Sequence, residues 1–151
     1  MKGLIQRVST ASVSVDEQVI AEIPTGLLLL LGVEPNDGSK EARALAKKVV
    51  GYRVFADDQG RMNRSLLDID GALLVVPQFT LAADTGSGTR PGFSTAAAPA
   101  VAERLFQEFL GSAESLLPRE RVGRGRFGAD MKVSLINDGP VTFMLQVGDS
   151  S

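Results

Sequence analysis

The segment GALLVVPQFTL, residues 71–81, begins with an apolar run that has no polar residue on either face. Such a run is typical of a strand buried on both sides within a sheet. Pro77 removes one backbone donor, so we expect the strand pairing to break or bulge there. Residues 27–33, LLLLLGV, form a second run that is apolar on both faces and predict another central strand.

Shorter segments around these two strands predict the rest of the sheet, because they alternate in polarity or are rich in β-branched residues. They are residues 2–9, 12–15, 18–23 and 53–55, with a closing hairpin of residues 131–136 and 141–147. Between the two hairpin strands, NDGP at 137–140 has the composition of a turn. A further turn is expected at Asp57–Gly60.

Two segments have the apolar periodicity of amphipathic helices. The first covers residues 40–51, and Ser39 is expected to be its N-cap. The second begins at Pro99, since proline is favourable at the first helical position, and ends before Pro118.

The order of these elements predicts an α+β fold in a single domain over residues 1–151. We expect a curled, mostly antiparallel, barrel-like sheet with the two helices packed on it. Residues 82–98 are rich in Ala, Gly, Ser, Thr and Pro, and predict a long ordered loop. Loops of that length inside a compact domain are more often functional than accidental.

Composition restricts the chemistry that is open to the chain. With no histidine and no cysteine, Ser-His-Asp and Cys-His mechanisms, zinc sites built on those residues, and disulfides are all impossible. The remaining candidates for a carboxylate Mg²⁺ site are Asp57, Asp58, Asp68 and Asp70. Glycines lie near these aspartates and favour turns instead. We therefore expect no metal and no cofactor, and a chemistry of hydroxyl, amide and backbone groups.

The chain has no segment typical of export or of membrane insertion. Its longest apolar run, residues 26–33, is far shorter than the roughly 20 residues that span a bilayer. The apolar part of the N-terminal segment is too short for a signal peptide. Since the lack of cysteine also fits a reducing compartment, we expect a cytoplasmic protein with no membrane partner.

Charge is unevenly distributed, although the net charge is only −2. Four arginines fall within eight positions: Arg119, Arg121, Arg124 and Arg126. Non-specific affinity for nucleic acid comes mostly from neutralised phosphates, so this chain is not expected to hold nucleic acid by bulk charge alone. The arginine cluster is either a solvated connection or a local contact for the phosphates of a partner.

Two polar segments adjoin the apolar strands. PQFT at 77–80 ends the first strand, and NDGPVT at 137–142 lies in the predicted hairpin. Alone, the second is an ordinary turn, although its Gly-Pro bond is of a type with an accessible cis form. With GRFGADM at 125–131, the two segments resemble the D-aminoacyl-tRNA deacylases, the D-Tyr-tRNA(Tyr) deacylase family, which usually carry Ser-Gln-Phe-Thr and Asn-x-Gly-Pro-Val-Thr. The likeness extends from Gln6 to Phe143.

The resemblance implies the fold of that family and a homodimeric ester hydrolase. Its substrate would be D-aminoacyl-tRNA, cleaved to free amino acid and tRNA. The resemblance also implies a cis Gly139-Pro140 bond that reaches into the active site of the partner subunit. The carbonyls of Gly139 and Pro140 would then occupy the place of an L-residue's side chain, so that L-substrates are rejected and glycyl-tRNA is admitted.

On this interpretation the PQFT segment holds the 3′-terminal aminoacyl-adenosine. Gln78, the backbone N–H of Phe79 and Thr80 would bind the ester carbonyl and the α-amino group. Thr80 without a base is a poor nucleophile, so attack by water, or assistance from the ribose hydroxyl, is the better chemistry. Aminoacyl esters are already activated, so positioning and carbonyl polarisation can suffice.

Three more residues match positions of the family. Arg7 would brace the Gly-Pro segment through the donors of its guanidinium. Phe127 and Met131 would line the pocket for the terminal adenosine, where a phenylalanine ring can stack on a base. Plain core packing is the alternative for Phe127 and Met131, and a surface position on an edge strand is the alternative for Arg7.

Pro77 departs from the family pattern, which usually has serine at this position. A related branch that acts on tRNA mischarged with L-alanine is similar in having proline there, but has alanine where this chain has Phe79. Three alternatives to the D-selective deacylase stay open. They are a deacylase of tRNA mischarged with a small L-amino acid, a small-molecule esterase or amidase for D-amino-acid derivatives, and a non-catalytic RNA-binding module.

Overall fold

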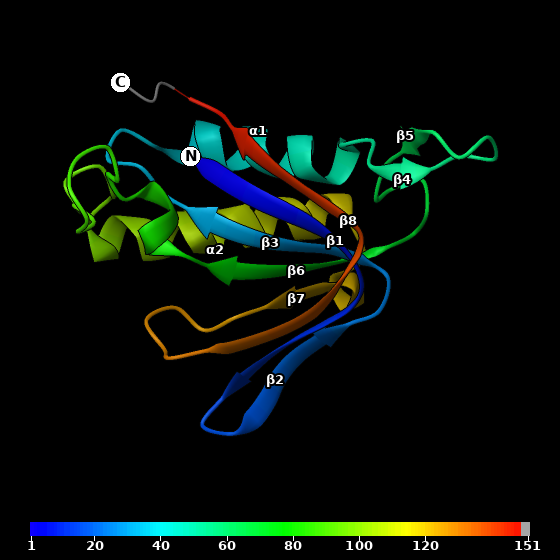
Figure 1. The fold of residues 1–151 in the computed structure, drawn as a ribbon, viewed down its shortest axis with the longest axis horizontal. Coiled ribbons are helices and arrows are strands. Elements are labelled where there is room, and N and C mark those ends of the chain that lie inside the picture. The colour runs from blue at the N-terminus through cyan, green and yellow to red at the C-terminus, as the bar shows by residue number, and fades with distance from the viewer. Residues whose placement is uncertain (149–151) are drawn as a thin grey trace.

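The computed structural model describes residues 1–148, which form a strongly curled sheet with two helices packed against one face (Figure 1). The strands of the sheet are β1 (Lys2–Val15), β2 (Gln18–Ile23), β3 (Gly26–Gly32), β6 (Ala72–Pro77), β7 (Val122–Arg124) and β8 (Lys132–Gln146). The other elements are the helices α1 (Ser39–Gly51) and α2 (Pro99–Leu116), the strands β4 (Phe55–Ala56) and β5 (Met62–Arg64), and the 3-10 helices η1 (Phe79–Ala82) and η2 (Arg119–Arg121). The predicted α+β class is confirmed.

Strand β1 organises the sheet. It pairs antiparallel with β3 along its first half, with β2 along its second half and with β8 along nearly its whole length. β3 then pairs parallel with β6, and β6 parallel with β7. Four of the six strand pairs among the described residues are antiparallel, as expected. The parallel pairs arise because α1 lies between β3 and β6 in the chain, and α2 between β6 and β7, and parallel strands need such crossovers.

The curl of the sheet brings β2 back over β6 and β7. A side chain added at Gly123 of β7 would meet Ala21 and Ile23 of β2 at 3.5 Å. The sheet is therefore nearly closed, which confirms the barrel-like shape expected from the sequence.

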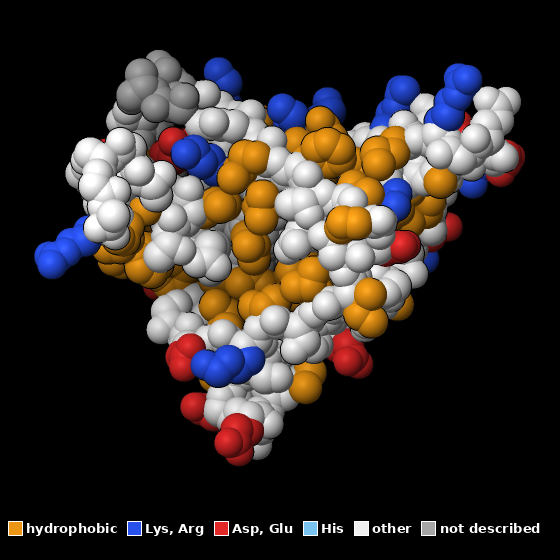
Figure 2. Space-filling view, viewed as in Figure 1, with side chains coloured by type: hydrophobic (Ala, Val, Ile, Leu, Met, Phe, Trp, Pro, Cys, Tyr) orange, Lys and Arg blue, Asp and Glu red, His pale blue; other side chains and the backbone are white. Residues whose placement is uncertain are grey.

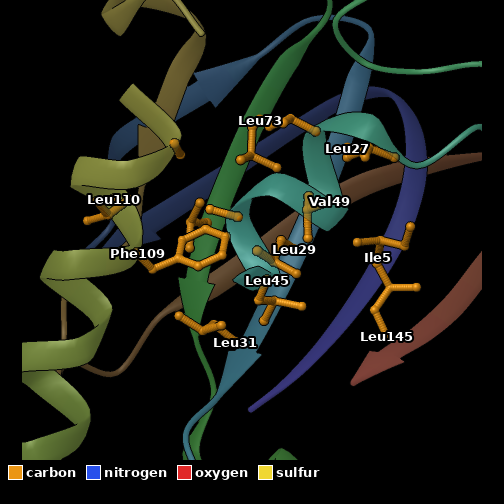
Figure 3. Close-up of a cluster of buried hydrophobic side chains, with 14 of the residues drawn as sticks. Ile5, Leu27, Leu29, Leu31, Leu45, Val49, Leu73, Phe109, Leu110 and Leu145 are labelled. Carbon is orange, nitrogen blue, oxygen red and sulfur yellow. The ribbon is translucent and has the colours of Figure 1, made fainter. Parts of the chain in front are cut away.

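Both predicted central strands are buried on both faces. Leu29 of β3 and Leu73 of β6 lie in the core beneath the helices, whereas Leu28 and Leu74 lie in a second core inside the curl. Figure 3 shows how the first core joins the sheet to both helices, through Leu45 and Val49 of α1 and through Phe109 and Leu110 of α2. The helices thus hold the outer face of the strands from which the site described below emerges.

The predicted closing hairpin is wrong, because β8 is one continuous strand that follows β1 from Lys2 to Ser14. At residues 137–141 the chain bulges without reversing, and the register on β1 shifts between Gln6 and Thr10. The side chain of Asn137 closes this bulge, since its Oδ1 accepts from the Val141 N–H at 2.9 Å and its Nδ2 donates to Thr142 Oγ1 at 2.8 Å. A turn composition can therefore also serve a bulge within one strand.

Ser39 is not the N-cap of α1, which is Gly38. The N–H of Gly38 donates to the carboxylate of Glu41 at 3.1 Å, so that the third residue of the helix caps its own start. The Ser39 hydroxyl instead donates to Glu108 of α2 at 2.7 Å and ties the two helices together. The loop at 82–98 is ordered as predicted, since Asp84 and Gly92 exchange two backbone hydrogen bonds across it.

Candidate functional site

A pocket of about 680 Å³ opens at the carboxyl end of β6. Three segments form its walls: the end of β6 with η1, residues 93–102 leading into α2, and residues 127–133 leading into β8. Figure 2 shows hydrophobic side chains gathered in the hollow that crosses the middle of the molecule. The first three residues of the PQFT segment thus line this pocket.

Gln78 marks the point at which β6 leaves the sheet. Its N–H still donates to the Leu31 carbonyl at 2.8 Å, and η1 begins at the next residue. A side chain at Gly32 would meet Leu81 Cβ at 3.1 Å and the Gln78 carbonyl oxygen at 3.4 Å, so glycine lets β3 approach this turn closely. The position of η1 is therefore fixed by the central strands.

The side chains of Gln78 and Thr80 contact each other. Gln78 Nε2 donates to Thr80 Oγ1 at 2.5 Å, and this bond orients the amide of Gln78 on the pocket wall. Thr80 is exposed and belongs to η1, but it is not among the residues that line the pocket. The structure therefore brings Gln78 and Phe79 to the pocket directly, and Thr80 through its contact with Gln78.

Two exposed phenylalanines stand at the pocket. The ring of Phe79 is 56% exposed and lies 5.4 Å from the ring of Phe93, centroid to centroid, at an angle of 53°. The loop that carries Phe93 is tied down after this residue, since Thr95 Oγ1 donates to the Ala82 carbonyl at 2.7 Å and Ala97 N–H to the Val33 carbonyl at 2.9 Å. The aromatic pair thus has a defined place beside Gln78.

Phe127 and Met131 line the opposite wall of the pocket. A side chain at Gly125 would meet the Met131 sulfur at 2.8 Å and Pro77 Cδ at 3.3 Å, so the glycine leaves room for the thioether against the end of β6. Phe127 packs in part on the core, 6.4 Å from the ring of Phe106. Both residues therefore contribute to the pocket, and Phe127 to the core as well.

Gly139 and Pro140 are not part of this pocket. They are exposed in the bulge of β8, and the peptide bond between them is cis, as the family resemblance implies. Arg7 of β1 braces the bulge, because its Nε donates to the Asp138 carbonyl at 2.9 Å and its Nη1 to the Val54 carbonyl at 2.7 Å. Within one chain, the two polar segments thus lie at separate places.

Asp130 is the one charged residue among the described residues that line the pocket, and it lies 3.3 Å from the ammonium of Lys132. The groups with shifted pKa values lie elsewhere. A hydrogen bond from the backbone N–H of Arg61 lowers the pKa of Asp57, and one from the backbone N–H of Ser65 lowers the pKa of Asp68. Both carboxylates hold turns. Within residues 1–148 no group of three or more acidic residues could hold a metal ion.

Three of the four arginines in the 119–126 cluster form ion pairs, with two carboxylates between them. Arg119 and Arg124 both pair with Glu114 of α2, and Arg121 pairs with Asp70 at 3.2 Å. The hydrogen bond from Arg124, together with the charges of Arg124 and Arg119, holds the pKa of Glu114 below its usual value despite its burial. These contacts favour a structural connection over a free phosphate-binding loop.

Sequence reasoning missed several residues of the pocket wall. Phe93, Ala97 and Ala102 were not predicted, because a loop and a helix start carry no periodic signal that points at a cavity. The run of small residues at 96–98 before Pro99 is the available signal, since small side chains leave space.

None of the helices within residues 1–148 is long and apolar enough to cross a membrane.

Residues 4–146 match the family model described as D-Tyr-tRNA(Tyr) deacylase. The chain is 67% identical over 148 residues to the D-aminoacyl-tRNA deacylase of Marinobacter nauticus, covering 98% of this chain and 95% of that one. It is 59% identical over 147 residues to the D-aminoacyl-tRNA deacylase of Vibrio parahaemolyticus, covering 97% of this chain and all of the other (100%).

Solved structures share the fold. One, described as c-Myc DNA Unwinding Element Binding Protein, is 36% identical with a TM-score of 0.94, covering 99% of this chain and 100% of that one. A second, described as a probable eukaryotic D-amino acid tRNA deacylase, is 16% identical with a TM-score of 0.83, covering 97% and 98% of the two chains. The second likeness shows the fold alone.

Proposed function

This chain belongs to the D-Tyr-tRNA(Tyr) deacylase family, and from that premise we propose that it hydrolyses the ester bond of D-aminoacyl-tRNA as a proofreading step in translation. Glycyl-tRNA is a second substrate in this proposal. The observation that carries it is the apolar pocket at the end of β6, with Gln78 and Phe79 on its wall. The proposal places the protein in the cytoplasm, where charged tRNA is used, and requires it to bind tRNA.

The proposed reaction needs no acid–base side chain. A water oxygen attacks the carbonyl carbon of the ester, the bond from that carbon to the ribose oxygen breaks, and a proton of the water passes to the ribose oxygen. Phe79 is the first residue of η1, so its N–H has no acceptor within that helix and can donate to the carbonyl oxygen. Losing one such donor in acyl transfer typically costs about 10²–10³-fold in rate.

Gln78 and Thr80 are proposed to hold the α-amino end of the substrate. Their mutual hydrogen bond leaves Oε1 of the Gln78 side chain and the second lone pair of Thr80 Oγ1 available to an ammonium group. Phe127 and Met131 then face the terminal adenosine from the opposite wall. This arrangement acts by positioning an ester that is already activated.

Chiral selection is assigned to the carbonyls of Gly139 and Pro140. Because this bulge of β8, called the Gly-Pro turn below, lies outside the pocket of its own chain, the proposal requires a second subunit to bring it there. β8 has the surface for such a contact, since Ile136 and Met144 are 59% and 49% exposed. We therefore propose a homodimer with two composite sites, each made of one subunit's pocket and the other's Gly-Pro turn.

The activity is tested by release of amino acid from D-tyrosyl-tRNA, L-tyrosyl-tRNA and glycyl-tRNA by the purified chain in the presence of a metal chelator. We expect cleavage of the D and glycyl substrates and not of the L substrate. Thr80→Val should lower kcat on the D substrate, whereas Thr80→Ser, which keeps the hydroxyl, should restore it. Cleavage of no substrate would reject the hydrolase, and equal activity of Thr80→Val would reject the site.

The composite site is tested by mixing subunits. Chains with Thr80→Val and chains with Gly139→Trp are produced together, so that both homodimers are impaired at every site. If each site joins two chains, every mixed dimer has one intact site, and roughly a quarter of all sites are intact after random pairing. If pocket and turn of one chain worked together, mixing would restore no activity.

A second candidate function follows from Pro77, which lines the pocket beside Gln78. Proline at this position is the feature shared with the branch that acts on tRNA mischarged with L-alanine. Cleavage of L-alanyl-tRNA at a rate near that of the D substrate would favour this function and would remove the chiral role from Gly139 and Pro140.

A further inference from the structure

The solvent face of α1 carries four exposed cations, Lys40, Arg43, Lys47 and Lys48. Residues 40, 43 and 47 follow the spacing of one helical stripe, and residue 48 lies beside it. The opposite stripe of the helix is buried in the core and consists of Ala42, Leu45, Ala46, Val49 and Val50. The four cations therefore point to solvent. We call the four cations the α1 basic face.

None of these four cations forms an ion pair with another residue in the described part of the chain. Glu41 is the one acidic residue of α1, and its carboxylate accepts from the Gly38 N–H at the start of the helix. By contrast, three arginines of the 119–126 cluster are paired with acidic groups. Positive charge that is free for a partner is therefore concentrated on α1 rather than in the segment where the sequence gathers its arginines.

The basic face continues past the end of the helix. Arg53 and Arg61 are exposed on the segment that leads into the β4–β5 hairpin and on the hairpin itself, and neither forms an ion pair within residues 1–148. Figure 2 shows Lys and Arg side chains along the upper rim of the molecule, where Figure 1 places α1 and this hairpin. Acidic side chains near the hairpin tip are engaged, since Asp58 pairs with Arg64 at 2.8 Å and Asp57 binds backbone N–H groups.

This surface is joined directly to the Gly-Pro turn. Arg7 donates to the Val54 carbonyl at 2.7 Å, three residues after the end of α1, and to the Asp138 carbonyl at 2.9 Å, one residue before Gly139. Tyr52, which follows the helix, has its ring 6.0 Å from the ring of Phe143 in β8. The α1 basic face and the turn are thus neighbours on one chain, while the pocket of that chain lies elsewhere.

We propose that the α1 basic face binds the phosphate backbone of the tRNA beyond its terminal adenosine. The inference rests on the proposed function and on its composite site. An ester held in the pocket of one subunit lies beside the Gly-Pro turn of the other, so the RNA leads onto α1 of the subunit that donates the turn. The four cations span about 12 Å along the helix axis, enough for several phosphates, and phosphate contacts supply affinity without reading sequence.

The test compares two triple variants of the full chain with equal change of charge. One carries Arg43→Gln, Lys47→Gln and Lys48→Gln on α1, and glutamine keeps the helix propensity. The control carries Arg119→Gln and Arg121→Gln, which test the rival surface at the arginine cluster. Its third change is Arg104→Gln, at an exposed position of α2. Each is assayed on D-tyrosyl-tRNA and on D-tyrosyl-adenosine, a substrate that has no phosphate backbone.

We expect the α1 variant to raise KM for D-tyrosyl-tRNA by roughly tenfold or more at physiological salt, with kcat retained, and to leave D-tyrosyl-adenosine unaffected. The slope of log affinity against log salt should flatten by about 2–3 in the α1 variant, close to 0.9 per lost phosphate contact. An unchanged KM for the tRNA substrate, a loss on both substrates alike, or a larger loss in the control would each overturn the proposal.

Mixed dimers test which subunit supplies the surface. In a dimer of a Thr80→Val chain with a Gly139→Trp chain, the one intact site takes its Gly-Pro turn from the Thr80→Val chain. The α1 substitutions should therefore lower activity on D-tyrosyl-tRNA when placed on that chain and not when placed on the other. The opposite result would overturn the cross-subunit path.

Binding of uncharged tRNA keeps this test separate from the proposed activity. If the wild-type chain cleaved no ester, the proposed function would fail, yet weaker tRNA binding by the α1 variant alone would still support the surface. Equal binding by wild type and α1 variant would reject the surface even in an active deacylase.

Discussion

The proposed selectivity depends on the backbone conformation of Gly139. Its φ is +139°, in the region that favours glycine, and a side chain there would meet Val141 Cγ2 at 2.6 Å and Arg7 Nη2 at 3.1 Å. A methyl group at this position would therefore push the turn away from the arginine that braces it. The carbonyls assigned to chiral selection would move with it.

Gly139→Ala should consequently lower kcat/KM on the D substrate by at least roughly tenfold, because a displacement of about 1 Å at a positioned group can cost 10²-fold. Stability should also fall by about 1–3 kcal/mol for the strained backbone. The matched control is Gly60→Ala in the β4–β5 turn, where φ is +77° and no atom lies within 4 Å of an added Cβ. It should lose similar stability in urea unfolding but keep its activity, and equal loss of activity in both variants would remove the special role of Gly139.

Most of the candidate site residues can be predicted from the sequence, but through their match to family motifs rather than through apolar periodicity. The matched motifs predict Gln78, Phe79, Phe127 and Met131 as site residues, and all four line the pocket. No motif or periodicity predicts Phe93 there, because its place beside Phe79 depends on how the 82–98 loop folds back. The roles of the named residues remain predictions.

At the scale of elements, β8 shows what local patterns leave open. Residues 137–140 have the composition of a hairpin turn, and only the long antiparallel partner β1, far away in the sequence, makes them a bulge. The parallel pairing of β3, β6 and β7 was likewise missed, although each pair is separated by a predicted helix. Burial on both faces of β3 and β6 was predictable, because their apolar runs are continuous.

The contact between α2 and β7 should make stability depend on pH. Arg124 and Arg119 hold the pKa of Glu114 below its unfolded value of about 4.3, so the pair stabilises the folded state above that pH. The stabilisation is lost as the pH falls through the folded pKa, where the carboxylate takes up a proton. Glu114→Gln should therefore be less stable than wild type at pH 7 and approach it below about pH 4.

Urea unfolding of both proteins between pH 3 and 7 measures this difference. Asp130→Asn is a suitable comparison, since its partner Lys132 is exposed and such pairs contribute little. If the difference in free energy of unfolding between wild type and Glu114→Gln stayed constant from pH 3 to 7, it would contradict the ion-pair explanation.

At the scale of the whole molecule, the exposed side of β8 is where we expect the second subunit of the proposed homodimer to bind. Within the described residues β8 pairs only with β1, which leaves one edge of a 15-residue strand without a strand partner. Uncovered edges of this length invite pairing with another chain. Phe143 and Met144 are adjacent and both exposed, so the two faces of β8 are open there.

Ile136→Lys with Met144→Lys should shift the protein from dimer to monomer at micromolar concentration, because two charges would have to be buried in the proposed interface. Deacylase activity should fall with the dimer fraction, as sedimentation velocity and assays over a range of concentrations would show. Val19→Lys is the control, since Val19 is 61% exposed on β2 and lies outside β8. A monomer with full activity would contradict the composite site.

The continuity of β8 along β1 also limits how the gene can change in length. Met131 on the pocket wall immediately precedes β8, and Gly139 lies in the bulge of that strand. A single inserted or deleted codon between them would reverse the faces of the residues that follow. In the proposed homodimer, both composite sites would be altered by one such event. We therefore expect relatives to keep this spacing fixed, while insertions collect at the exposed tip of the 82–98 loop.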